Sequence, residues 1–333
     1  MHPSRRNHLT PPTWVIMGSW ADLLLVIVGM GLLFGGGEFL VRGAVGLARR
    51  FGVSELVIGL TIVGFATSTP ELLVSVKAAL KGVPEIAVGN VVGSNIANIL
   101  LIGGFTALLA SRVPLERGIR RELGIMLGAS MLLLIASAWG AIPRLAGLAL
   151  FLLLAFYLAM HFRAARQSHA AGELRRPDMA GAAPAWRSLM VLSAGLAMLA
   201  IGADWLVDGA SSIARAVGVS EAVIGLTVVA LGTSLPELAT SIVAAWRGRS
   251  EVAVGNVIGS NIFNILGILG VTAMIEPLDI ASRFLWFDVP LMLAISILFS
   301  AAVVVRNGLG RRSGAIMLAA YLAYTAALFV LPG

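Results

Sequence analysis

Long apolar runs, separated by short charged breaks, occupy most of this 333-residue chain. A helix needs about 20 mostly apolar residues to cross a bilayer. Ten runs are long enough, so the pattern predicts an all-α polytopic membrane protein with ten transmembrane helices. The predicted spans are residues 20–45, 54–80, 84–108, 121–139, 143–163, 187–213, 220–246, 250–275, 284–306 and 312–331.

Polar segments divide the chain into two parts. Residues 1–16 are a polar, proline-containing tail, and Met17 is an alternative start. No short apolar run is followed by a cleavage site, so we expect no cleaved signal peptide. The longest polar interval, 164–186, is expected to be a cytoplasmic linker between a first part, 17–163, and a second part, 187–333.

The two parts carry the same sequence twice. Residues 36–104 match residues 202–270 at a constant offset of 166, without a gap and with about 40 of 69 positions identical. Because the offset covers five helices, an odd number, the second part must cross the membrane in the opposite sense. We therefore predict two inverted five-helix repeats, which are typical of secondary transporters with a site at the membrane midplane. A duplicated bundle without transport is the weaker interpretation.

Composition agrees with a membrane protein. Hydrophobic residues make up 58% of the chain and charged residues 12%, against about a quarter charged in soluble domains. The absence of cysteine excludes disulfides and thiolate metal sites. The net charge of +7 is better explained by loop arginines beside anionic lipid than by nucleic acid. The distribution of lysine and arginine among the loops predicts a cell (inner) membrane protein with both termini outside.

Two carboxylates lie inside predicted spans. A charged side chain in the bilayer costs about 2.5–3.5 kcal/mol on insertion scales, so Glu71 and Glu237 are expected to line a cavity or ion path. Each follows a proline, in STPE and SLPE, which should kink the helix and free the carbonyls of Ala66 and Gly232. Thr67 lies four residues before Glu71, on the same helix face.

Amides and hydroxyls form a second polar stripe on the third and eighth spans. These residues are spaced by four, so they lie on one helix face. Carboxylate, amide and hydroxyl oxygens, without cysteine or histidine, suit hard cations such as calcium, sodium and magnesium. Asn90 and Asn256, which begin the two copies of this stripe, could equally well hold helices together. The stripe consists of Asn90, Ser94 and Asn98, repeated as Asn256, Ser260 and Asn264.

The motif pairs GFATSTPELLVS with GNVVGSNIANIL, and ALGTSLPELATS with GNVIGSNIFNIL, resemble the two alpha repeats of the cation/calcium exchanger superfamily. The similarity covers nearly the whole chain, and the nearest branch is the prokaryotic sodium/calcium exchangers. It implies that ions bind one acidic residue from each repeat, together with hydroxyl, amide and backbone oxygens. The implied ligands are Glu71, Glu237, Asn98, Asn264, Thr67, Ser68, Thr233, Ser234, Ser94 and Ser260, with the backbone of Gly64 and Ala230.

This resemblance also implies a mechanism. Sodium enters and drives calcium out by alternating access, and both ions are transported cargo, so no cofactor is expected. Well-known members carry an aspartate where this chain has Asn264, so this site has one charge fewer. The first and sixth spans resemble the sliding helices of the family, with smooth glycine surfaces in GLLFGGG and at Gly202 and Gly209. Glu38 and Asp204 lie in these spans and either pair with arginine or serve ion access.

Other functions are weaker candidates. A proton-coupled calcium exchanger would have the same fold, but the hydroxyls of Thr67, Ser68, Thr233 and Ser234 favour sodium. A passive cation channel would not need inverted repeats around paired carboxylates. The chain contains no HExxH, GxSxG or cysteine–histidine arrangement, so we expect no enzyme.

Overall fold

The computed structural model describes residues 13–51, 54–109, 118–170, 184–216, 230–305 and 308–330, which are almost entirely helical. Two short strands, β1 (Ala141–Ile142) and β2 (Leu278–Asp279), pair antiparallel, with Ala141 opposite Asp279. The helices before β1 are α1 (Thr13–Phe51), α2 (Glu55–Ile58), the π-helix η1 (Gly59–Val63), α3 (Gly64–Thr67), α4 (Thr69–Leu80), α5 (Pro84–Ala97), the π-helix η2 (Asn98–Ile102), α6 (Gly103–Leu109) and α7 (Ile119–Ala138). The later ones are α8 (Arg144–Ala170), α9 (Ala185–Ala216), α11 (Ala230–Gly232), α12 (Leu235–Trp246), α13 (Ser250–Phe263), the π-helix η4 (Asn264–Leu269), α14 (Gly270–Ile275), the π-helix η5 (Phe284–Asp288), α15 (Val289–Val305) and α16 (Arg311–Val330).

Several helical segments are long and apolar enough to cross a membrane. Within the described ranges there are seven, and a bent pair of helices makes an eighth. Each agrees with a predicted span to within a few residues. The predicted span 220–246 begins outside the described residues, and α16 covers the predicted span 312–331 without being among the eight. The eight are Trp20–Ala48, Pro84–Leu109, Ile119–Ala138, Arg144–His161, Ala185–Ile213, Ser250–Ile275, Phe284–Val305 and the pair Leu56–Thr67 with Thr69–Leu80.

The helix that contains the predicted span 143–163 continues into the predicted linker. Helix α8 continues to Ala170, well past residue 163, and α9 begins at Ala185. Residues 171–183 of the linker lie outside the described residues. The apolar span itself ends at His161, close to the predicted end at residue 163, and the helix continues beyond it.

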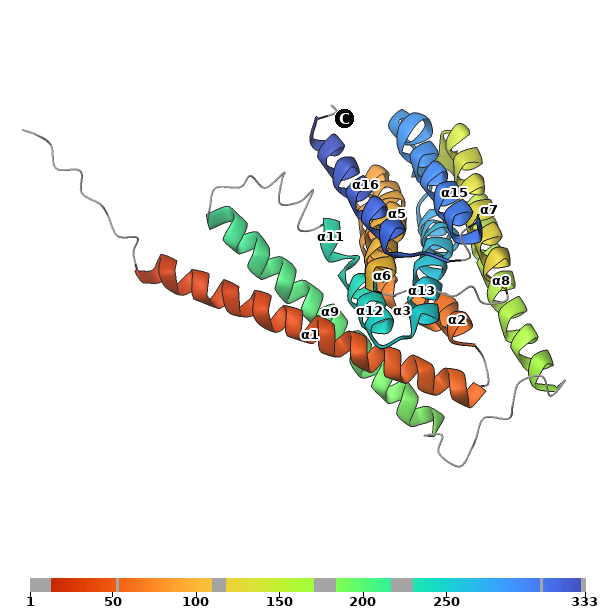
Figure 1. The fold of residues 1–333 in the computed structure, drawn as a ribbon. Helices are drawn as coiled ribbons and strands as arrows, with labels where there is room; N and C mark the ends of the chain where they lie inside the picture. The colour runs from red at the N-terminus through yellow and green to blue at the C-terminus, as the bar shows by residue number, and fades with distance from the viewer. Residues whose placement is uncertain are drawn as a thin grey trace, which may run out of the picture.

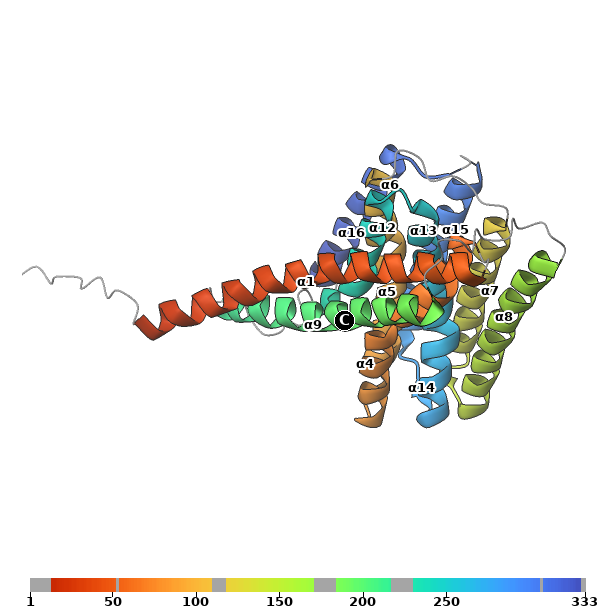
Figure 2. The same ribbon diagram turned by 90° about the horizontal axis from the view of Figure 1, so that it is seen from below.

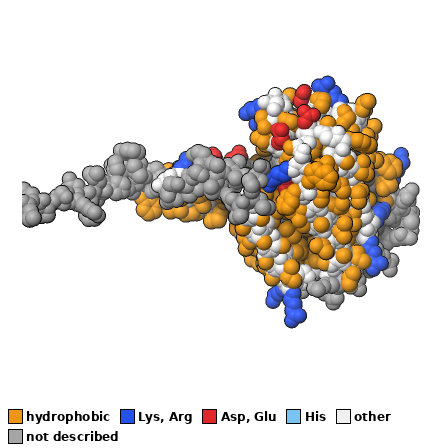
Figure 3. Space-filling view, turned by 90° about the horizontal axis from the view of Figure 1, so that it is seen from above, with side chains coloured by type: hydrophobic (Ala, Val, Ile, Leu, Met, Phe, Trp, Pro, Cys, Tyr) orange, Lys and Arg blue, Asp and Glu red, His pale blue; other side chains and the backbone are white. Residues whose placement is uncertain are grey.

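Apolar side chains dominate the surface of the molecule. Figure 3 shows one face on which hydrophobic side chains cover most of the helical core, while lysine and arginine gather towards its margins. Large apolar residues are widely exposed, including Trp286 at 79% and Leu298 at 69%. A soluble monomer rarely exposes such an extensive apolar surface, so the chain is a multi-pass membrane protein.

Two long helices, α1 and α9, lie side by side along one flank of the core (Figure 1). They run across the other helices, which stand nearly upright between them and the far side of the molecule (Figure 2). The main hydrophobic core lies among α5, α7, α13 and α15, and a second one joins α1 and α9 to α12. The two long helices thus form a layer of their own beside the compact bundle.

Glycines at intervals of seven bring α1 and α9 together. A Cβ atom at Gly36 would lie 2.9 Å from the carbonyl oxygen of Gly195, and one at Gly202 would lie 2.9 Å from that of Gly29. The same spacing continues to Gly43, where a Cβ atom would lie 2.6 Å from a backbone nitrogen of α9. Since the partners run in opposite order along the two helices, the pair is antiparallel. The expected smooth glycine surface therefore lies mostly between α1 and α9, and not against the core.

A further buried carboxylate joins α7 to α8. Glu122 is 1% exposed and accepts a hydrogen bond of 3.0 Å from the Tyr157 hydroxyl. His161 Nε2 lies 3.1 Å from the same carboxylate, and Arg121 Nε donates to its other oxygen at 2.9 Å. Since both oxygens are fully engaged, this glutamate connects two helices and is not a candidate for binding an ion.

Candidate functional site

The helix that carries Glu71 is broken one turn before it. The segments Leu56–Thr67 and Thr69–Leu80 meet at an angle of 44°. Ser68 lies at the break, with φ −83° and ψ 7°, and Pro70 follows within the first turn of α4. Proline has no N–H group to continue the ladder of helical hydrogen bonds, so the predicted kink is confirmed. Ser234 has nearly the same geometry before α12, with φ −90° and ψ 2°.

These breaks place each glutamate in the first turn of a helix, where free N–H groups favour a negative charge. Glu71 is 1% exposed and Glu237 is 2% exposed. Each accepts a hydrogen bond from the serine at the break in the opposite half. Ser68 Oγ donates to Glu237 Oε1 at 3.0 Å, and Ser234 Oγ donates to Glu71 Oε1 at 3.5 Å. The two motifs therefore interlock around one point.

Two asparagines support the glutamates from behind. Each side-chain amide donates both to the backbone carbonyl of a glutamate and to the serine hydroxyl one turn further along the same helix. This arrangement holds α4 against α5 and α12 against α13, which favours a structural role for both asparagines. The distances are 3.0 and 2.9 Å from Asn90 Nδ2 to Glu71 O and Ser75 Oγ, and 3.3 and 3.0 Å from Asn256 Nδ2 to Glu237 O and Ser241 Oγ.

Asn256 makes further contacts that are not seen for its counterpart Asn90 among the described residues. Its Oδ1 lies 3.2 Å from Thr67 Oγ1 and 3.4 Å from Ser260 Oγ, and both hydroxyls can donate to it. Thr67 and Ser260 are fully buried. One amide thereby fixes two of the predicted hydroxyl ligands, one from each half.

Asn98 and Asn264 are the first residues of the π-helices η2 and η4. Such turns are rare and occur mainly at functional sites. Helix α12 packs against η2, and α4 packs against η4, so the turn that begins with each asparagine contacts the helix that carries the glutamate of the other half. Asn98 Nδ2 donates to Asn261 Oδ1 at 3.2 Å, and Asn264 Nδ2 donates to Asn95 Oδ1 at 3.0 Å.

Several buried side-chain oxygens here have no hydrogen-bond partner among the described residues. A buried oxygen without a partner is costly, and a buried carboxylate oxygen is especially so. Of the ten such oxygens in the described residues, five belong to the predicted ligand set, and both halves contribute. Their chemistry fits a hard cation, which binds carboxylate, amide and hydroxyl oxygens. They are Glu71 Oε2, Glu237 Oε2, Asn98 Oδ1, Asn264 Oδ1 and Thr233 Oγ1.

The remaining predicted ligands lie close by. Ser94 is buried on α5, four residues before Asn98. The backbone of Gly64 packs against α13, where a Cβ atom at this position would lie 3.1 Å from Ser260 N. Ala230 begins the short helix α11, four residues before Ser234 at the break in its half, and its side chain is outside the described set.

Sequence reasoning missed four residues that orient this site. Asn95 and Asn261 bind the two ligand asparagines, and Ser75 and Ser241 receive the amides behind the glutamates. All four are polar, buried and repeated at the offset of 166. Identity between the halves at buried polar positions was therefore the signal that could have identified them.

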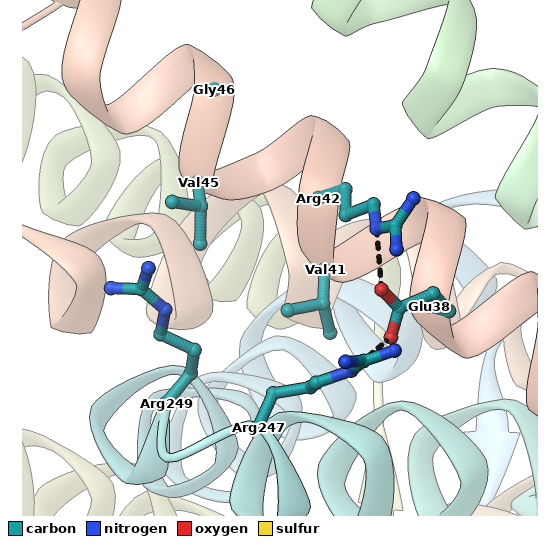
Figure 4. A pocket seen from close by; sticks show the side chains of 7 residues that line it. All are labelled: Glu38, Val41, Arg42, Val45, Gly46, Arg247 and Arg249. Carbon is teal, nitrogen blue, oxygen red and sulfur yellow. Dashed lines mark hydrogen bonds and ion pairs between the residues drawn. The ribbon is translucent and has the colours of Figure 1, made fainter.

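Glu38 lies outside the site. Its carboxylate is bound by Arg42 on the same helix and by Nε of Arg247, the residue after α12, at 2.7 Å. This pair lies at the edge of a cavity of about 310 Å³ (Figure 4). Pairing with arginine is thus the interpretation that the structure favours for this residue. Asp204, at the matching position of α9, is exposed. The salt bridge between Glu38 and Arg247 connects the long-helix layer to the bundle.

Known proteins resemble this chain over almost its full length. The model of the sodium/calcium exchanger protein family matches residues 21–163 and 187–330. The sodium/calcium exchanger MaX1 of Methanosarcina acetivorans is 33% identical over 344 residues, covering 92% of this chain and 98% of its own. The inner membrane protein YrbG of Escherichia coli is 36% identical over 313 residues, covering 92% and 96%. A structure of the sodium-calcium exchanger NCX_Mj, soaked with sodium and strontium, superposes with a TM-score of 0.80 at 31% identity, covering 94% and 98%.

Proposed function

This chain belongs to the sodium/calcium exchanger family of membrane transport proteins, and from that premise we propose that it exchanges sodium for calcium by alternating access to a single buried site. In this proposal calcium and sodium are the transported substrates, as in the family, and the protein is not an enzyme. The observation that carries the proposal is the crossed pair of hydrogen bonds between Ser68 and Glu237 and between Ser234 and Glu71.

Those bonds leave the second oxygen of each glutamate buried and without a partner among the described residues. We assign these two oxygens, with the amide oxygens of Asn98 and Asn264, as the centre of a calcium site. Two carboxylates give the site a charge of about −2, which one calcium ion neutralises. Eight other ligands are implied, of which two to four would complete the six to eight oxygens that calcium takes. They are Thr67, Ser68, Thr233, Ser234, Ser94, Ser260 and the backbone of Gly64 and Ala230.

We further propose that the chain has ten transmembrane helices in two inverted five-helix repeats. The halves are residues 17–163 and 187–333, joined by the cytoplasmic linker 164–186. Symmetric hydrogen bonds at the offset of 166 support this arrangement, since the bond between the halves from Asn98 to Asn261 is repeated as the bond from Asn264 to Asn95. The two matched segments of the family leave out the same interval. The excess of arginine in alternate loops favours an inner membrane location with both termini outside the cytoplasm.

Sodium is the proposed coupling ion because hydroxyl oxygens make up much of the predicted ligand set. Neutral hydroxyl and amide oxygens can coordinate a sodium ion without a further negative charge in the site. Proton coupling would need only an oxygen that titrates, and would not account for so many hydroxyl groups. Three sodium ions in a site of charge about −2 would leave it at about +1, which is unfavourable in a medium of low dielectric constant. We therefore expect fewer sodium ions per cycle, or weaker sodium binding, than with an aspartate at Asn264.

Calcium flux in proteoliposomes tests the function. Purified protein is reconstituted, and calcium uptake is measured while the sodium gradient and the proton gradient are varied independently. Uptake that follows only an outward sodium gradient supports the proposal. Uptake that follows only the proton gradient would make the chain a proton/calcium exchanger of the same fold. Rapid flux without either gradient would indicate a channel.

A further inference from the structure

Behind each ligand asparagine lies a second asparagine, and behind that a methionine. Asn261 Nδ2 lies 3.6 Å from Met126 Sδ, and Asn95 Nδ2 lies 3.6 Å from Met292 Sδ. The two methionines, on α7 and α15, differ in number by the repeat offset of 166 although they lie beyond the ungapped match. Both are fully buried. The same chain of three hydrogen-bonded side chains, ligand asparagine to second asparagine to methionine, thus occurs twice, once towards each half of the site.

The direction of each chain follows from which atoms can donate. A thioether sulfur accepts hydrogen bonds and cannot donate them. The amide beside Met126 must therefore turn its NH₂ group towards the sulfur, which leaves Asn261 Oδ1 facing the other way. That oxygen accepts a hydrogen bond from Asn98 Nδ2 at 3.2 Å. Among the polar side-chain atoms of these three residues, Asn98 Oδ1 is therefore the one left without a partner in the described structure.

The second chain ends in the same way. Asn95 turns its NH₂ group towards Met292, and its Oδ1 accepts from Asn264 Nδ2 at 3.0 Å. Asn264 Oδ1 is then left buried and without a partner in the described structure. Each chain crosses between the halves, because the ligand asparagine depends on an asparagine of the other repeat and on a methionine of its own.

We propose that Met126 and Met292 are positioning residues that direct the side-chain oxygens of Asn98 and Asn264 towards calcium. The proposal rests on the proposed function, since it takes calcium as the ion at these oxygens. Without the sulfur, the side-chain amide of Asn261 or Asn95 can rotate and present its NH₂ group to the ligand asparagine. The ligand asparagine must then also rotate, which would turn its NH₂ group towards the cation.

Leucine is the substitution that isolates the sulfur. Exchange of methionine for leucine conserves volume and is well tolerated in cores. Met126→Leu and Met292→Leu should each weaken calcium binding by about three- to tenfold, the equivalent of one lost hydrogen bond. The matched control is Met131→Leu on the same helix as Met126, because this methionine is 44% exposed and lies outside the chain.

A second set of variants separates orientation from packing. Aspartate at position 264 has no N–H group, so Asn95 must rotate to donate to it and would then turn its Oδ1 towards Met292 Sδ, another acceptor. Met292→Leu removes that conflict. It should therefore weaken calcium binding in the wild-type background but not in Asn264→Asp. A packing defect would cause the same loss in both backgrounds.

Equilibrium binding of radioactive calcium to detergent-purified protein, without sodium, measures these effects apart from transport. Weaker binding in Met126→Leu and Met292→Leu, unchanged binding in Met131→Leu, and no loss from Met292→Leu beside Asn264→Asp would support the two methionines as positioning residues. Equal binding in wild type and all three leucine variants, or an equal loss in both backgrounds, would overturn that role alone. A wild-type protein that binds no calcium would overturn the proposed function as well.

Discussion

Replacement of Glu237 by glutamine tests the charge of the site with little change in shape. Glutamine keeps one oxygen that can accept the hydrogen bond from Ser68, now 3.0 Å from Glu237 Oε1. It converts the unpartnered Oε2 into an NH₂ group. Because the side chain is 2% exposed, water cannot replace the lost charge at this position.

The size of the effect follows from Coulomb's law. A carboxylate about 4 Å from a divalent cation, at an effective dielectric constant near 20, contributes about 8 kcal/mol of attraction. Lost hydration of both groups, and the removed repulsion from Glu71, offset most of this amount. If about a quarter remains, calcium binding weakens by about 2 kcal/mol, or about thirtyfold. Exchange at low calcium should therefore nearly vanish.

Stability should change in the opposite direction. An unpaired buried charge opposes folding, so Glu237→Gln should raise the unfolding temperature of detergent-purified protein in the presence of a chelator. Calcium should then raise this temperature strongly in wild type and only weakly in the variant, because a ligand stabilises the folded state in proportion to its binding. Glu85→Gln, an exposed glutamate at the start of α5, is the control and should behave as wild type.

Sodium-driven calcium uptake in vesicles and thermal unfolding with and without calcium are the two measurements. Wild-type uptake in Glu237→Gln, or an unchanged calcium-dependent rise in its unfolding temperature, would show that this carboxylate does not face the ion. Loss of uptake accompanied by a lower unfolding temperature in the chelator would indicate a folding defect, and would also contradict the reasoning.

Three further predictions concern topology, charge and packing. In this cysteine-free chain, cysteine at Ala171 should react with impermeant thiol reagents only from the cytoplasm and cysteine at Pro84 only from outside, and labelling from one side would contradict the inverted repeats. Asn264→Asp should add a steeper loss of exchange as pH falls and change the sodium dependence, because an aspartate titrates and an amide does not; superimposable curves would place residue 264 away from the ions. Gly202→Ala should lower the unfolding temperature because its Cβ would lie 2.9 Å from a backbone oxygen of α1, whereas Gly31→Ala, with no atom within 4 Å, should not; equal effects would argue against close packing of α1 and α9.

Local patterns account for what could be predicted of the fold. Most predicted spans lie within a few residues of helices in the structure, because apolar length alone decides whether a segment can cross a bilayer. The bend at Ser68 also followed from a single residue, since proline breaks the helical hydrogen bonds wherever it occurs. Hydropathy reports membrane contact and not the end of a helix, so α8 could continue beyond its apolar run.

The candidate ligands could be selected from the sequence because buried polar residues that recur in both halves are rare and costly in lipid. Their partners could not. Helical spacing places Ser68 beside Glu71, yet its hydroxyl binds Glu237, 169 residues away. The orientation of the amides was equally hidden, since it depends on two buried sulfurs that hydropathy treats as ordinary core residues.

The sequence by itself thus determined the membrane-spanning segments, the repeat and the identity of the polar groups, all of which depend on residue type and spacing along one helix. Only the tertiary structure decided which oxygens remain without a partner at the centre and which are used in holding helices together. The glycines of α1 and α9 illustrate the same division. Their regular spacing is visible in the sequence, but whether they face the core or each other depends on how two distant helices pack. Spacing defines a face of a helix, and contacts between distant segments define what that face meets.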